Sequence, residues 1–176
     1  MIFYLAGPHV KHIYSIFKHL TFFSAIFLLY GCGTSGGTPE PIIMDLEIST
    51  SDKLNPDIEN RASPIVIRIY QLTHIDSFNN SDFFALYEND QSLLAKDLKY
   101  REEIEIKPNQ TITKPIEINP GSKYIATLAA FRDLDKAQWK SILEIDPLNM
   151  RPIKVNLGEF NVSIMQNKQD ADTQAD

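Results

Sequence analysis

Short segments in which non-polar and polar residues alternate run through most of the chain. Residues 65–70 are an example, with an isoleucine at every second position. A period of two places alternate side chains on the same face, which is typical of a half-buried β-strand. The pattern predicts eight short strands, which begin near Ile42, Ile65, Glu103, Ile112, Tyr124, Ser141, Ile153 and Phe160.

Three departures from simple alternation add detail. Residues 124–131 are non-polar on both faces, which predicts a central strand, and Pro115 predicts an edge strand or a bulge because proline has no N–H to donate. Between Ser77 and Lys99, non-polar residues follow Ser81 at helical spacing, which predicts one or two short helices with Ser81 as N-cap. We therefore expect an all-β fold, an eight-stranded antiparallel β-sandwich with a short helical insertion between strands two and three.

The first 31 residues have the pattern of an export signal. Lys11 and Lys18 precede a non-polar segment of residues 20–30, which ends just before Cys32, the only cysteine of the chain. The segment is shorter than the roughly 20 non-polar residues that span a bilayer, and its length fits the core of a secretory signal. Leu29 and Gly31 before Cys32 resemble a bacterial lipoprotein signal, so Cys32 is the predicted lipidation site. The alternative is an ordinary secretory signal with an accidental cysteine.

The sequence predicts four parts of the chain. Residues 1–31 are the predicted lipoprotein signal peptide, and residues 32–40 are a flexible tether, rich in Gly, Ser and Thr, whose last eight residues reach about 16 Å. Residues 41–165 are the predicted sandwich domain. Residues 166–176 are polar and are predicted to be a disordered tail.

Charge and residue counts remove several classes of function. All 23 Asp and Glu follow Cys32, with only fifteen of the 17 Lys and Arg, so this part has a formal charge of about −8 and nucleic acid is not an expected partner. Its one histidine, His74, cannot build a His/Cys zinc site, and the sequence has no Gly-x-Ser-x-Gly turn for a hydrolase triad. We expect no enzyme activity, no metal and no cofactor apart from a covalent lipid on Cys32. One cluster is interpreted as a solvated strand face, with a Ca²⁺ site as the less favoured alternative: Glu102, Glu103 and Glu105.

The segment between the first two predicted strands is unusually long. It runs for sixteen residues, from Ser49 to Pro64, whereas hairpin loops commonly have two to five. Leu54 and Ile58 are non-polar residues within an otherwise polar stretch. Either they anchor a partner, or Leu54 folds back onto the sandwich.

Several short motifs occur in a particular order, and with the lipidation signal they resemble the TssJ family, also called SciN or VasD. The resemblance covers about Ile42 to Met165 and implies a transthyretin-like β-sandwich without enzyme activity. These lipoproteins belong to the outer-membrane part of the type VI secretion system. The motifs are Leu54-Asn55-Pro56-Asp57, Arg61-Ala62-Ser63-Pro64, Ser81 to Tyr87, Ala129 to Asp133, and Trp139-Lys140.

The resemblance also implies partners and a location. It implies that the protein lies at the periplasmic face of the outer membrane and holds the periplasmic C-terminal region of the inner-membrane protein TssM, and indirectly TssL. Gly33, in place of the Asp that retains lipoproteins in the inner membrane, fits this location. The alternative is a periplasmic lipoprotein that binds a ligand or peptide. The resemblance implies that the loop from Ser49 to Pro64 makes the contact with TssM. The candidate partner-binding residues within it are Leu54, Asn55, Pro56, Asp57, Ile58, Glu59 and Arg61.

Overall fold

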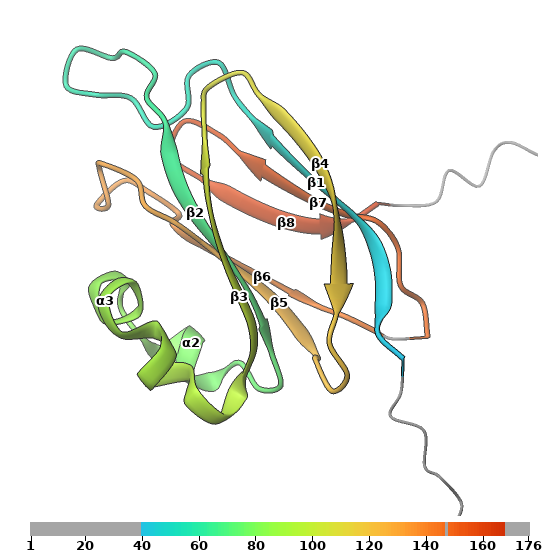
Figure 1. Ribbon diagram of the computed structural model, residues 1–176. Coiled ribbons are helices and arrows are strands. Elements are labelled where there is room, and N and C mark those ends of the chain that lie inside the picture. The colour runs from blue at the N-terminus through green and yellow to red at the C-terminus, as the bar shows by residue number, and fades with distance from the viewer. Residues whose placement is uncertain (1–39, 147, 168–176) are drawn as a thin grey trace, which may run out of the picture. The chain divides into compact units, whose positions relative to one another are not determined.

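The computed structural model describes residues 40–146 and 148–167. The predicted signal peptide with Cys32, nearly all of the tether and most of the tail lie outside the described residues. Two four-stranded sheets pack face to face, with helices outside one of them (Figure 1). The strands are β1 (Ile42–Thr50), β2 (Ile65–Leu72), β3 (Leu98–Ile106), β4 (Thr111–Ile118), β5 (Tyr124–Ala129), β6 (Lys140–Glu144), β7 (Ile153–Leu157) and β8 (Val162–Gln166). The insertion comprises α2 (Asp76–Asn80), α3 (Phe83–Leu94) and the 3₁₀ turn η1 (Ala95–Asp97).

The sheets have the strand orders β4-β1-β7-β8 and β3-β2-β5-β6. This confirms the predicted eight-stranded sandwich and the insertion between strands two and three. One neighbouring pair departs from the antiparallel expectation, because β1 and β7 run parallel, with Leu46 opposite Ile153. A parallel pair needs a crossover connection rather than a hairpin, and here the chain passes through the other sheet between the two strands.

Two predictions about individual strands are confirmed. Pro115 lies opposite Asp45 on β4, at the edge of its sheet, where a missing N–H is tolerated. Strand β5 lies between β2 and β6, and five of its six residues are buried. Its two non-polar faces therefore reflect cover on both sides of the sheet.

The main core fills the space between the sheets. Ile67 and Ile69 of β2 are fully buried there, as are Leu46 and Ile48 of β1. Burying such side chains stabilises the fold by roughly 1.5–3 kcal/mol each. Strand β8 continues to Gln166, which pairs with Ile153, so the ordered sandwich includes one residue more than we expected.

A second core lies beneath the helices, on the outer face of the sheet β3-β2-β5-β6. Tyr70 and Leu72 of β2 pack there against Phe78 of α2 and Leu86 of α3. In the row of β2 that alternates with the isoleucines, Arg68, Tyr70 and Leu72 are thus also buried. The N-cap of α3 is Asp82, whose carboxylate accepts a hydrogen bond from the Ala85 N–H at 2.8 Å, and not Ser81 as predicted.

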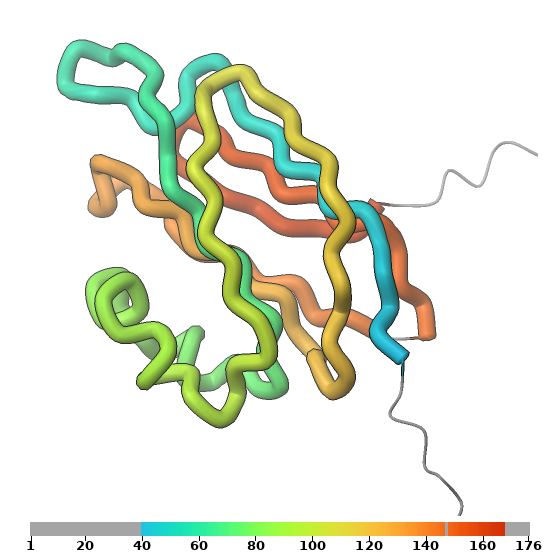
Figure 2. The backbone as a smooth tube through the Cα atoms, viewed as in Figure 1, coloured from blue at the N-terminus to red at the C-terminus, as the bar shows by residue number. Residues whose placement is uncertain are grey.

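The described chain begins far from the long loop. Strand β1 starts at one end of the sandwich and Thr50, its last residue, lies at the other end (Figure 2). Nine residues at the rise of a β-strand extend over about 30 Å. The loop that follows comprises residues 51–64, two fewer than predicted because β1 is longer. In the part of the chain that the structure describes, neither helix is long and non-polar enough to cross a membrane.

Candidate partner-binding site

The β1–β2 loop has a buried base. The Leu54 side chain is fully buried and belongs to the main core, so it folds back onto the sandwich. Its carbonyl accepts a hydrogen bond from the Ser63 N–H at 2.9 Å, which closes the loop across its neck. This position takes Leu54 away from the surface where a partner could reach it.

Asn55 ties the loop base to the end of the loop and to two other segments. Its amide donates to the Pro64 carbonyl at 2.9 Å, and its side-chain oxygen accepts from the Arg132 N–H at 2.8 Å. Its own N–H donates to the Glu159 carbonyl at 3.2 Å. The residue has a φ of 45°, a left-handed conformation that asparagine tolerates better than most residues. With 3% of its surface exposed, Asn55 positions the loop and does not present a side chain to a partner.

The tip of the loop is built around the Asp57 carboxylate. One carboxylate oxygen accepts from the N–H groups of Glu59 and Arg61, both at 2.9 Å. The other accepts from the Arg61 guanidinium, whose Nη2 lies 2.8 Å away, and Arg61 also contacts Glu59 at 3.2 Å. The Arg61 N–H is the main cause that holds the pKa of Asp57 below its usual value, with the guanidinium adding to it. Arg61 therefore holds the shape of the loop through contacts with other residues of the same loop.

Ile58 is the most prominent residue of this tip, because its side chain is fully exposed. The structure brings together five of the seven residues assigned to partner binding: Pro56, Asp57, Ile58, Glu59 and Arg61. It separates them from Leu54 and Asn55, which lie at the buried base. The base is fixed by backbone and side-chain hydrogen bonds, so the tip is held in place without being covered.

An open groove of about 870 Å³ adjoins the tip. One wall is the loop, and the others come from the start of α3, the β5–β6 connection and the β7–β8 turn. The places of these segments in the fold can be followed in Figure 1. Sequence reasoning missed this groove, since no periodic pattern relates segments so far apart in the chain. Its lining residues are Pro56, Asp57, Ile58, Asn60, Phe84, Arg132, Asp133, Leu134, Asp135, Lys136 and Phe160.

Charges at the groove are largely paired. Lys136 donates to the Asp133 carboxylate at 2.7 Å, and this hydrogen bond is the main cause that lowers the pKa of Asp133. The Lys136 ammonium also lies 5.7 Å from the centre of the Phe160 ring. The groove thus combines non-polar side chains with charged ones, of which Asp57, Asp133 and Lys136 are in ion pairs.

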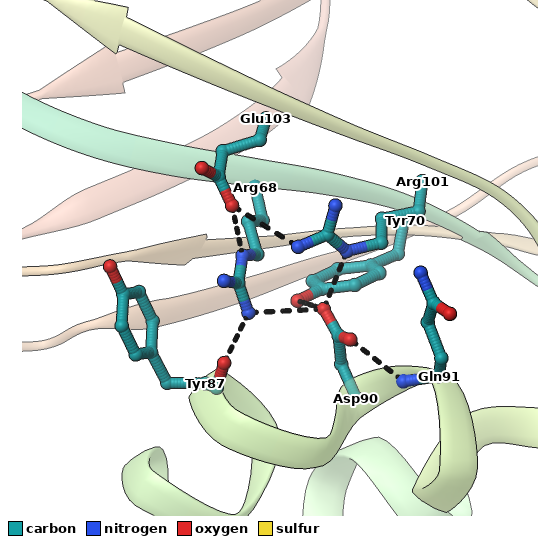
Figure 3. A network of polar contacts seen from close by, with 7 residues as sticks. All are labelled: Arg68, Tyr70, Tyr87, Asp90, Gln91, Arg101 and Glu103. Atoms are coloured by element: carbon teal, nitrogen blue, oxygen red, sulfur yellow. Dashed lines mark hydrogen bonds and ion pairs between the residues drawn. The ribbon is translucent and has the colours of Figure 1, made fainter.

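A second polar cluster joins α3 to the sheet beneath it (Figure 3). Asp90 of α3 accepts hydrogen bonds from Arg68 at 3.1 Å, Arg101 at 2.7 Å and the Tyr70 hydroxyl at 2.9 Å. Arg68 also donates to Glu103 at 2.7 Å. Side chains from β2, β3 and α3 are thereby joined in one network.

The pKa shifts in this network follow from its contacts. Burial alone raises the pKa of Asp90, but the hydrogen bonds from Arg101 and Tyr70 and the charges of Arg101 and Arg68 outweigh it and leave the pKa lowered. Burial and the Asp90 carboxylate both raise the pKa of Tyr70. In the described residues, no buried side-chain nitrogen or oxygen lacks a hydrogen-bond partner. We therefore assign this network a structural role, which is to fix the helical insertion.

The other candidate groups have structural partners as well. The His74 Nδ1 lies 3.0 Å from an Asp97 carboxylate oxygen and 3.2 Å from the Thr73 hydroxyl. The interpretation of the glutamates on β3 as one solvated face is wrong, because adjacent strand residues point to opposite sides. Glu103 meets Arg68, whereas Glu102 accepts from the Tyr100 hydroxyl and pairs with Lys114. Across residues 40–146 and 148–167, no group of three or more His, Cys, Asp or Glu is placed to hold a metal ion.

Residues 43–160 match the family described as type VI secretion lipoprotein, which includes VasD, EvfM and TssJ. The chain belongs to this type VI secretion lipoprotein family. The family is one of structural lipoproteins and is not a known enzyme family. Among curated protein sequences, none matches the chain.

Solved structures agree with the family. The lipoprotein TssJ1 from Pseudomonas aeruginosa is 26% identical, with a TM-score of 0.69 over 73% of this chain and 98% of that one. Serratia marcescens Lip, a membrane-bound component of the type VI secretion system, has the same fold at 21% identity, with a TM-score of 0.65 over 73% and 99%. A chain in the structure of the TssM C-terminal domain from EAEC is 23% identical, with a TM-score of 0.57 over 69% and 99%. The resemblance of the sequence to the TssJ family is thereby confirmed.

Proposed function

We propose that this type VI secretion lipoprotein is anchored in the outer membrane and holds the periplasmic C-terminal region of a TssM-like inner-membrane protein, and through it associates with TssL. The β1–β2 loop makes the contact. Membership of the family supports a structural role in secretion, and the similarity to a chain in a TssM structure supports this partner.

The observation that carries the proposal is the exposed tip on a fixed base. Ile58 is fully exposed, while Leu54 and Asn55 hold the loop to the sandwich. A non-polar side chain presented on a rigid support loses little entropy on binding, which favours affinity. The loop also lies at the end of the sandwich away from the start of β1, so a protein tethered through its N-terminus would present it away from the membrane.

Binding of the purified chain to the periplasmic region of TssM tests this function. We expect the wild type to bind, and Ile58→Ala to weaken binding without lowering the melting temperature. A wild-type protein that fails to bind the TssM region would refute the proposal. A small-ligand function has weaker support, because the side chains between the sheets are packed against one another and the groove beside the loop tip is open to solvent.

Membrane fractionation tests the anchor separately. The family is one of lipoproteins, which supports a lipid on Cys32, the only cysteine. Two or more acyl chains give stable membrane attachment, at about 0.8 kcal/mol for each buried CH₂. We expect the wild type in the outer-membrane fraction and Cys32→Ser as an unprocessed or released protein. If the serine variant fractionates like the wild type, the lipid is not the anchor.

A further inference from the structure

We propose that the groove beside the loop tip is a second contact for the same partner and takes a non-polar side chain from the TssM segment that meets the loop. This inference rests on the proposed function and extends the interface beyond the β1–β2 loop. The groove, at about 870 Å³, lies within the range of roughly 300–1,000 Å³ that is typical of binding pockets. It has room for more than one side chain of a partner segment.

Exposed non-polar side chains gather at this groove. Ile58 is fully exposed, Phe84 has 61% of its surface exposed, and Phe160 is half-buried, and all three line the groove. They come from the β1–β2 loop, the start of α3 and the β7–β8 turn. Exposed large non-polar residues that converge on one hollow, rather than lying scattered, mark an interaction surface.

The charges at the groove favour a non-polar anchor over a charged one. Asp57 is paired with Arg61, and Asp133 with Lys136. Arg132 and Asp135 make no ion pair in the described part of the chain, and their opposite charges leave the groove close to neutral. Charges of this kind orient a partner more than they add affinity, so burial of the non-polar side chains Ile58, Phe84 and Phe160 is the main source of binding energy that the groove offers.

The walls of the groove are fixed before any partner arrives. Asn55 joins the loop to the Arg132 N–H, and the Gln138 N–H donates to the Phe160 carbonyl at 2.8 Å. Residues of the β5–β6 connection are thus linked both to the loop and to the β7–β8 turn. A preformed hollow in which non-polar side chains stand beside polar ones can take an anchoring side chain without first having to be ordered, which favours affinity.

Substitution of Phe84 tests the groove in the full chain. We expect Phe84→Ala to weaken binding of the TssM region about five- to thirtyfold. Phe84→Glu should weaken binding further, because it places a charge in the groove, yet a glutamate in the first turn of α3 is compatible with the helix. Leu93 lies near the other end of the same helix and is also exposed, so Leu93→Ala and Leu93→Glu are matched controls.

The outcomes separate this inference from the proposed function. The groove is part of the interface if the Phe84 variants bind more weakly than the wild type, the Leu93 variants bind like the wild type, and all four have similar melting temperatures. If Ile58→Ala weakens binding but both Phe84 variants bind like the wild type, the groove is not part of the interface and the proposed function stands. If the wild type does not bind the TssM region, both proposals fail.

Discussion

Two regions that connect the strands, the helical insertion and the β1–β2 loop, are each organised around an aspartate that arginine holds. In the insertion, Asp90 lies buried between α3 and the sheet and is bound by Arg68 and Arg101. In the loop, Asp57 lies at an exposed tip and is bound by Arg61, whose side chain is 70% exposed. The same pair of groups therefore works in two different surroundings.

The difference in burial gives the two aspartates different roles, Asp90 in folding and Asp57 in recognition. Breaking a buried pair leaves an uncompensated charge away from water, so Asp90 and its partners should matter mainly for stability. An exposed pair is screened by solvent and contributes little to stability. At the loop tip the pair instead holds a shape from which Ile58 projects. The loop also contains both situations within itself, since its base is buried and its tip is not.

The largest expected effect is at Asp90. Asp90→Ala should lower the free energy of unfolding by about 3–5 kcal/mol, because Arg68 stays buried without one of its two carboxylate partners. Urea unfolding followed by circular dichroism measures this. Glu88→Ala on an exposed position of the same helix is the control, with an expected change within about 0.5 kcal/mol. Equal effects for the two variants would contradict the assigned role of the network.

The contribution of Asp90 to the stability of the fold should depend on pH. Because the pKa of Asp90 is lower in the folded protein than its ordinary value, its contribution is fully present above that ordinary value. It is lost as the pH falls through the lower pKa of the folded state. The stability difference between the wild type and Asp90→Asn should therefore shrink in acid, which unfolding at neutral and acid pH can measure. A stability difference that grows in acid would contradict a lowered pKa of Asp90 in the folded protein.

A substitution at the loop base should have the next largest effect. Leu54→Ala removes a fully buried side chain from the main core and should cost about 2–5 kcal/mol of stability. Unfolding measured beside Ile58→Ala provides the contrast, because Ile58 contacts the core so little that its variant should unfold like the wild type. If Leu54→Ala is as stable as the wild type, the loop base is not part of the core.

The burial of Leu54 shows which features of the fold could be predicted from the sequence pattern and which could not. Alternation located strands such as β1 and β7 because each buries a regular row of side chains. Leu54 belongs to no such row, and only the path of the loop brings it to the core. The non-polar faces of β5 did indicate cover on both sides, but the helices that bury Arg68 and Tyr70 could not be placed from β2 alone. The parallel pairing of β1 with β7 could not be predicted either, because the pairing of strands far apart in the sequence leaves no local signal.

Asn55 should show an intermediate effect. Asn55→Ala removes the hydrogen bonds to the Pro64 carbonyl and the Arg132 N–H and places alanine at a positive φ. Leaving buried backbone groups without partners should cost about 1–3 kcal/mol of stability. Asn55→Gly is the informative control, since glycine accepts the backbone conformation but not the hydrogen bonds. If both variants are as stable as the wild type, the loop base does not depend on Asn55.

The tip should affect binding and leave the fold alone. Ile58→Ala should weaken binding of the TssM region by about 1–2 kcal/mol, or roughly five- to thirtyfold, with stability unchanged. Isothermal titration calorimetry gives the affinity and a melting curve gives the control. Leu148→Ala, at another well-exposed non-polar residue, should leave the affinity as it is. A loss of affinity for Leu148→Ala equal to that of Ile58→Ala would show that exposure, and not position in the loop, determines the effect.

Arg61 should show the smallest effect of the five substitutions. Its guanidinium holds Asp57 and Glu59 at the surface, where ion pairs are weak and screened by salt. The two N–H groups that donate to Asp57 remain in Arg61→Ala, so the tip keeps much of its shape and the affinity should fall by less than about fivefold. Titrations at low and high salt measure this, and the difference between Arg61→Ala and the wild type should shrink as salt increases. A tenfold or larger loss that salt does not reduce would mean that Arg61 meets a desolvated group of the partner, and the exposed pair would then contribute to recognition directly.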